Sequence, residues 1–194
     1  DPLPGDAFAC DAIENLIIPR TSDIGGFQVR RALPSRQRRL VGPFIFFDRM
    51  GPAILKPDEA LDVKPHPHIG LSTVTYLFDG EIRHRDSLGT EKVIRPGDIN
   101  LMTAGRGIVH SEMPEQEDGL MWGFQLWVNL PAKDKMTAPR YQDIAPERIP
   151  EIELAPGVSA RVIAGEAGGV KGPVEAEATA AVYLDLRLAA GARR

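Results

Sequence analysis

Two stretches, PHPHIG at residues 65–70 and MTAGRGIVHSEMP at residues 102–114, hold three of the four histidines of this 194-residue chain. Each contains two potential metal ligands separated by one residue: His66 with His68, and His110 with Glu112. Residues i and i+2 of a β-strand share one face, so each pair can direct two ligands toward one point. Because turn signals lie between the stretches, the second can return beside the first. The sequence therefore predicts one metal site.

The ligand types restrict the metal without choosing it. Three imidazoles and one carboxylate suit iron(II), and also nickel(II), copper(II), manganese(II) or zinc(II). On an octahedral ion these four ligands leave two positions open, whereas a tetrahedral zinc ion would be filled by them. Since imidazole must be neutral to bind a metal, we expect the affinity to fall below about pH 6.

The composition excludes several classes of protein. The net charge of −4 argues against binding of nucleic acid by the whole chain, although residues 30–39 contain five arginines. The single cysteine, Cys10, cannot form an internal disulfide and suits a reducing compartment. We therefore expect a cytoplasmic protein, or a nuclear one in a eukaryote. No apolar stretch approaches the length of a membrane span. The chain begins at Asp1 without a methionine, which is consistent with a missing N-terminal piece or a removed signal peptide.

Glycine and proline, 36 residues in total, divide the chain into short apolar or alternating segments. Short strands separated by turn signals are typical of an all-β sandwich or barrel. The predicted strands are 27–31, 44–47, 71–78, 81–85, 92–94, 100–102, 108–112, 123–130, 159–164 and 182–188. Long helices are not expected, because no segment keeps a 3.6-residue period. Residues 58–61 and 146–149 can each form one helical turn.

Three regions follow from this pattern. Residues 1–131 are predicted to form an N-terminal metal-binding domain, and residues 132–157 are polar and rich in proline, as in a connector that packs on the first domain. Residues 158–194 resume the strand pattern and form the start of a second domain.

Other polar residues have a structural and a functional interpretation. His84 is expected to form a hydrogen bond with a neighbouring residue, with a direct metal role as the alternative. Asp98 is expected to serve its turn. Gln125 and Trp127 share a strand face, so they either line the interior beside the metal or, for Trp127, pack in the core. Cys10 is expected to be a small apolar residue rather than a redox sensor.

Several motifs, in order, resemble the pirin family of the cupin superfamily. Residues 41–48 resemble the first strand of that family, residues 65–70 and 73–77 resemble its first cupin motif, and residues 102–114 resemble its second. Residues 125–130, 135–136 and 139–142 are similar to the segment that leaves the first barrel. The resemblance runs from about residue 20 to the end of the chain.

The resemblance implies a fold and two alternative functions. The fold is a bicupin, two stacked β-barrels, with iron(II) in the N-terminal barrel held by His66, His68, His110 and Glu112. Some pirin-like proteins open the flavonol quercetin with dioxygen, which implies a quercetin 2,3-dioxygenase-type oxidoreductase. Glu112 would then take the proton of the flavonol hydroxyl, and Trp127 would contact the rings. The alternative is a metal- or redox-dependent regulatory protein that binds a transcription factor or a metabolic enzyme complex without catalysis.

The chain departs from the family pattern at two places. Many pirin-like sequences have a glutamate where Ser72 stands, so an acid–base role for that position is not expected here. Residues 182–188 resemble the opening strand of the second barrel, after which the chain ends. We therefore expect an incomplete C-terminal barrel: either the chain is a truncated product, or this half borrows strands from a partner in a homo-oligomer.

Overall fold

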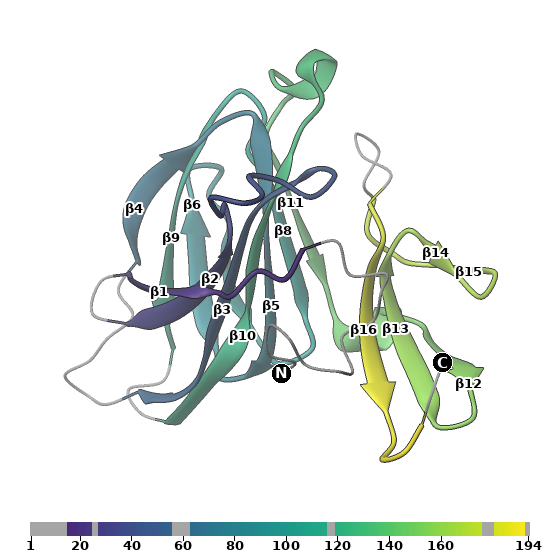
Figure 1. The fold of residues 1–194 in the computed structure, drawn as a ribbon. Helices are drawn as coiled ribbons and strands as arrows, with labels where there is room; N and C mark the ends of the chain where they lie inside the picture. Colours follow the sequence, from purple (N-terminus) through teal and green to yellow (C-terminus); the bar gives the residue numbers. More distant parts are fainter. Residues whose placement is uncertain (1–14, 25–26, 56–62, 116–118, 176–180, 193–194) are drawn as a thin grey trace.

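The computed structural model describes residues 15–24, 27–55, 63–115, 119–175 and 181–192 (Figure 1). This part of the chain consists of β-strands with two short 3-10 helices, η1 (Ala132–Asp134) and η2 (Pro146–Arg148). The all-β prediction is confirmed, and η2 occupies the helical turn expected at 146–149. Cys10 and the turn expected at 58–61 lie outside the described residues. No helix in the described ranges is long and apolar enough to cross a membrane.

A seven-stranded antiparallel sheet forms the centre of the molecule. Its strands, in spatial order, are β1 (Arg20–Asp23), β2 (Gln28–Leu33), β3 (Phe44–Leu55), β10 (Gly119–Asn129), β5 (Leu71–Asp79), β8 (Ile99–Thr103) and β11 (Arg140–Ile144). The edge strand β11 pairs with β8, so part of the expected connector belongs to this sheet. The domain boundaries drawn from the sequence stay a prediction.

A four-stranded sheet faces the inner side of the large sheet (Figure 1). It has the order β4 (Val63–His68), β9 (Ile108–Pro114), β6 (Ile82–Asp86) and β7 (Glu91–Ile94). Within the described residues no hydrogen-bonded ladder joins the two sheets, so the expected cupin barrel takes the form of two facing sheets. The turn before β9 needs Gly105, whose φ is +52° and whose added Cβ would lie 2.2 Å from the carbonyl oxygen of Thr137.

The C-terminal strands form a separate small sheet on the outer side of the large one (Figure 1). This sheet has the order β12 (Glu151–Ala155), β13 (Val158–Ala164) and β16 (Tyr183–Leu188), and β14 (Glu166–Ala167) pairs with β15 (Val170–Lys171) beside it. Ile163 and Ala164 of β13 pack on the buried side chains of Val74, Ile99 and Leu126.

Central strand β5 is buried on both faces, which explains why its sequence shows no apolar–polar alternation. Val74 and Tyr76 point outward under the C-terminal sheet, whereas Thr75 and Leu77 point inward. Leu77 belongs to an apolar cluster between the two facing sheets, which also contains Phe27, Val29, Met50, Leu55, Ile82, Ile94 and Met121. Burial on both faces therefore fixes the large sheet between two layers.

One buried arginine joins the C-terminal sheet to the large sheet. Arg161 of β13, 7% exposed, donates to the Tyr76 hydroxyl at 2.6 Å and to the carbonyl oxygen of Gly97 at 3.1 Å. The Tyr76 hydroxyl donates in turn to Asp185 at 2.8 Å, and Asp185 lies opposite Arg161 on β16. The three side chains thus form one connected polar group inside an apolar interface.

Arg161→Met is expected to lower the free energy of unfolding by about 3 kcal/mol, because the variant leaves the Tyr76 hydroxyl and the carbonyl oxygens of Gly97 and Pro146 without their buried donor. The matched control is Arg187→Met, which removes an arginine whose side chain is 61% exposed and pairs with Glu151 at 3.8 Å. The control is expected to change stability by less than about 0.5 kcal/mol. Urea unfolding at pH 7 measures both values, and equal losses in the two variants would contradict this role of Arg161.

Candidate metal centre

Three imidazoles converge at the pairing of β4 with β9. The register places His66 directly opposite His110, and His68 shares the face of His66 two residues along β4. The Nε2 atom of His68 lies 3.0 Å from Nε2 of His66 and 3.1 Å from Nε2 of His110. The structure thus brings together all three histidines of the two predicted stretches, with one ring nitrogen of each directed at the same point.

Burial keeps two of these imidazoles neutral. His68 is 7% exposed and His110 is 2% exposed. Burial, reinforced by the neighbouring imidazoles, lowers the pKa of His68 to about 4 and that of His110 to about 3. At neutral pH their ring nitrogens can therefore act as metal ligands without first losing a proton.

A backbone contact orients the third imidazole. Nδ1 of His66 lies 2.8 Å from the carbonyl oxygen of Lys64, which can only accept a hydrogen bond. Nδ1 must therefore carry the proton of the neutral ring, and Nε2 presents its lone pair to the other two histidines. Metal-binding histidines commonly donate their second ring N–H to a backbone carbonyl in this way.

The spacing of the nitrogens fits a six-coordinate ion. With bonds of about 2.1 Å, two nitrogens at a right angle lie about 3.0 Å apart, whereas the tetrahedral angle separates them by about 3.4 Å. The observed separations of 3.0 and 3.1 Å match the right angle. These two separations would therefore suit imidazoles that are neighbouring ligands of a six-coordinate ion.

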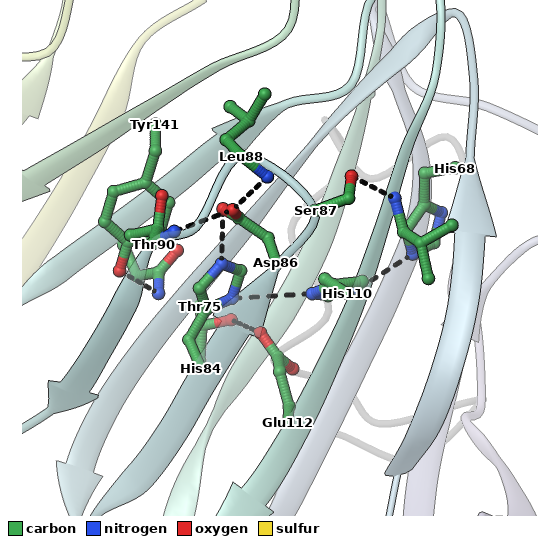
Figure 2. Close-up of polar contacts among 12 residues, drawn as sticks. His68, Thr75, His84, Asp86, Ser87, Leu88, Thr90, His110, Glu112 and Tyr141 are labelled. Carbon is green, nitrogen blue, oxygen red and sulfur yellow. Dashed lines mark hydrogen bonds and ion pairs between the residues drawn. The ribbon is translucent and has the colours of Figure 1, made fainter.

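Glu112 lies beside this group rather than in its middle. Its carboxylate comes within 4.8 Å of ligand nitrogens of both His110 and His84, whereas the group of His66, His68 and His110 does not include it. The hydroxyl of Thr75 lies 2.9 Å from Glu112 Oε1 (Figure 2). It also lies 2.8 Å from Gln125 Oε1, and its single proton can be donated to either oxygen. Burial raises the pKa of Glu112.

A row of polar side chains crosses the large sheet opposite these residues. The register sets Thr75 beside Gln125, Gln125 beside Asp48, and Asp48 beside Arg31. Arg31 donates two hydrogen bonds to Asp48, at 2.8 and 2.7 Å. Although Arg31 belongs to the arginine-rich segment 30–39, its side chain points toward the site. The local sequence does not indicate this placement.

Aromatic side chains form one wall of a cavity of about 270 Å³ beside the histidines. Phe46 and Trp127 stack with their ring centroids 4.1 Å apart, and the Trp127 ring meets His68 edge to face at 4.9 Å. The guanidinium of Arg31 lies 4.5 Å from the centroid of Phe46. Gln125 and Trp127 both line this cavity, as in the interpretation that they line the interior beside the histidines.

The remaining candidates lie at different distances from the centre. Ser72 points to the outer face of β5, where it donates to Thr103 at 3.1 Å and lines a different cavity. Asp98 accepts a hydrogen bond from the backbone N–H of Arg95 at 2.8 Å, as expected for a turn residue. His84 is fully buried and bonds Asp86 at 3.0 Å, as expected, but it also lies next to His110, which sequence reasoning missed.

Comparisons with known proteins point to one family. The Pirin family profile matches residues 26–128. A pirin-like protein of Caulobacter vibrioides is 50% identical over 161 residues, which cover 80% of this chain and 56% of that protein. The chain therefore spans little more than half the length of that relative.

Two solved structures share the fold. The structure of a quercetin 2,3-dioxygenase from Acinetobacter baumannii matches with a TM-score of 0.76 and 40% identity, over 81% of this chain and 52% of that one. The bacterial pirin YhhW from Escherichia coli, in complex with nickel(II), matches with a TM-score of 0.58 and 16% identity, over 77% of this chain and 70% of that one. The second likeness concerns the fold alone.

The lowered histidine pKa values predict a loss of stability in acid. In the unfolded chain, His68 and His110 become protonated as the pH falls below about 6.5. In the folded chain, His68 becomes protonated only near pH 4 and His110 only near pH 3. The metal-free protein should therefore lose up to about 1.4 kcal/mol per pH unit for each group as the pH falls through this range. Glu112, with its raised pKa, acts in the opposite sense.

Comparison with His110→Asn isolates one of these contributions. Urea unfolding of chelator-treated protein at pH 7, 6 and 5 should show a steeper loss for the natural chain than for the variant. Parallel pH profiles for the two proteins would contradict the buried, neutral state of His110.

Proposed function

The chain belongs to the pirin family, and on that basis we propose that it is a metal-dependent oxidoreductase of the quercetin 2,3-dioxygenase type. The observation that carries this proposal is the convergence of three imidazoles in the wall of an aromatic-lined cavity, where Nε2 of His68 lies 3.0 and 3.1 Å from Nε2 of His66 and His110. We assign His66, His68, His110 and Glu112 as the ligands of one divalent ion, and iron(II) as that ion.

The ligand geometry supports an ion with open coordination positions. The near-right-angle spacing of the imidazoles suits six-coordinate iron(II), nickel(II) or manganese(II) better than a structural tetrahedral zinc ion. The position of Glu112 beside His110 on the same strand face supports its role as the fourth ligand. When bound, the metal would supply Lewis acidity and redox chemistry toward the flavonol and dioxygen.

The cavity supports a flat aromatic substrate. The stacked Phe46 and Trp127 rings give one wall a broad apolar surface, which can contact a flavonol ring face or edge. The cavity volume of about 270 Å³ is close to the lower end of the range for small-molecule sites. The His68 ring contacts the Trp127 ring edge to face, so the aromatic wall of the cavity lies directly against the histidine group.

Glu112 is the residue best placed to accept a proton from the substrate hydroxyl. Burial raises the pKa of Glu112 in the metal-free site. As a metal ligand, Glu112 would accept the proton only by loosening from the ion. Thr75 provides a hydrogen bond to Glu112 Oε1 and can exchange that bond for one to Gln125. Thr75 and Gln125 can therefore stabilise Glu112 in more than one protonation state without a change in the backbone.

Two variants are expected to separate metal binding from substrate binding. His110→Ala should weaken iron(II) binding by at least about tenfold, because it removes one of the three imidazoles. Trp127→Leu should keep the metal content of the natural protein and lose binding of quercetin, because it removes the aromatic wall. Anaerobic metal titration and fluorescence titration with quercetin provide the two measurements. Full iron content in His110→Ala would disprove the ligand assignment.

Oxygen uptake tests the activity itself. Protein loaded with iron(II) under anaerobic conditions and mixed with aerated buffer and quercetin should consume one dioxygen per quercetin lost, with release of carbon monoxide. The same protein without quercetin and the Trp127→Leu variant serve as controls. If fully loaded protein consumes no dioxygen, the dioxygenase proposal is wrong, and the metal-dependent regulatory function becomes the better-supported alternative.

A further inference from the structure

The hairpin between β6 and β7 holds a buried carboxylate close to the metal centre. Oδ1 of Asp86 accepts the backbone N–H groups of Leu88 at 2.8 Å and Thr90 at 3.1 Å, and Oδ2 accepts from Nε2 of His84 at 3.0 Å (Figure 2). The side chains of Asp86 and His84 are both fully buried. Asp86 thus has three fixed donors, which leave its carboxylate one orientation.

The same hairpin is attached to the strand that carries His110. The backbone N–H of Ser87 donates to the carbonyl oxygen of Val109 at 2.9 Å, and the N–H of Val109 donates to the Ser87 hydroxyl at 3.2 Å. The register also places Asp86 opposite His110 and His84 opposite Glu112. The position of Asp86 is therefore tied to the position of the His110 backbone.

For neutral His84, the hydrogen bonds indicate which ring nitrogens carry the protons. A carboxylate can only accept, so Nε2 of His84 carries a proton, and Nδ1 of neutral His84 has a lone pair. Nδ1 of His84 lies 3.5 Å from Nδ1 of His110, a long contact in which only His110 can then be the donor (Figure 2). With its proton on Nδ1, neutral His110 presents an unprotonated Nε2 to His66 and His68.

We propose that Asp86 and His84 are positioning residues that set the tautomer of His110 and so keep its Nε2 available as a metal ligand. The contacts from Asp86 through His84 to His110 do not require a metal. Only their effect on metal affinity rests on the proposed metal centre. The ring of Tyr141, 4.7 Å from that of His84, packs on His84 and limits its rotation.

The alternative use of His84 is as a ligand of a second ion. His84, His110 and Glu112 bring ligand atoms within 4.8 Å of one another. However, Nε2 of His84 is directed at Asp86, and the other nitrogen of His110 is already directed at His68. A second ion would therefore have to share the His110 ring with the first, and we assign His84 to the orientation of His110.

The tautomer can be read directly in the metal-free natural protein. Nitrogen-15 NMR distinguishes protonated from unprotonated ring nitrogens, and the four histidines of the chain can be assigned by single substitutions. The proposal expects Nδ1–H with unprotonated Nε2 for His110, and Nε2–H with unprotonated Nδ1 for His84. A His110 ring protonated on Nε2, or a His84 ring protonated on both nitrogens, would overturn it.

Asp86→Asn reverses the chain of hydrogen bonds at its first step. The amide oxygen can still accept the N–H groups of Leu88 and Thr90, but the amide NH₂ now faces Nε2 of His84. His84 should then carry its proton on Nδ1, and His110 should move its own proton to Nε2. We expect binding of nickel(II), an air-stable probe, to weaken by about 10- to 100-fold.

Asp98→Asn is the matched control, because Asp98 also serves a turn between strands through one backbone N–H. It should leave both the His110 tautomer and the nickel affinity unchanged. An unchanged His110 tautomer in Asp86→Asn would overturn the inference, even if metal binding weakened. Two nickel ions per natural chain would also overturn it. If the natural protein binds no nickel, the proposed metal centre fails, whereas the NMR result still decides the role of Asp86 and His84.

Discussion

The pairing register of β4 with β9 is the constraint on which the candidate site depends. It sets His66 directly opposite His110, and the two-residue period of the strands then places His68 and Glu112 on the same face. A slip of one residue would turn all ligands of one strand to the other face. The pairing of β6 with β9 extends the same order, since it sets His84 opposite Glu112 and Asp86 opposite His110.

Burial of polar groups between the two sheets gives the site its chemistry. The outer face of the large sheet packs against the C-terminal sheet through an apolar cluster. Its inner face can therefore carry the polar row of Thr75, Gln125 and Asp48 while the sheet keeps an apolar core on its other side. The same enclosure lowers the pKa values of His68 and His110 and raises that of Glu112. The imidazoles are therefore held ready to bind a metal, and the carboxyl group is made more basic.

Local sequence patterns predicted much of the fold but little of what surrounds the histidines. All ten expected strands are present, because each has its own apolar or alternating pattern. Strands β1 and β11 were missed because their polar sequences become strands through pairing with a neighbour. Strand β12 was missed because it lies in the proline-rich segment that was interpreted as a connector. The i, i+2 spacing of the ligands predicted that the three histidines meet, because alternate residues of a strand share one face.

The roles of His84, Asp86 and Arg31 depend on contacts between strands distant in sequence, which no local pattern records. The prediction that His84 bonds a neighbour was confirmed, but its contact with His110 arises from the register of β6 with β9. Arg31 stands in an arginine-rich segment, and its sequence neighbours give no sign that the ion pair with Asp48 of the adjacent strand directs it toward the site.

The position of a bound metal tests this account most directly. Anomalous diffraction at the iron edge from crystals loaded with iron(II) would locate the ion without reference to any activity. The account predicts one anomalous peak in contact with Nε2 of His66, His68 and His110, and a six-coordinate shell. A peak bounded by His84 and Glu112 instead, or a tetrahedral shell closed by four protein ligands, would contradict it.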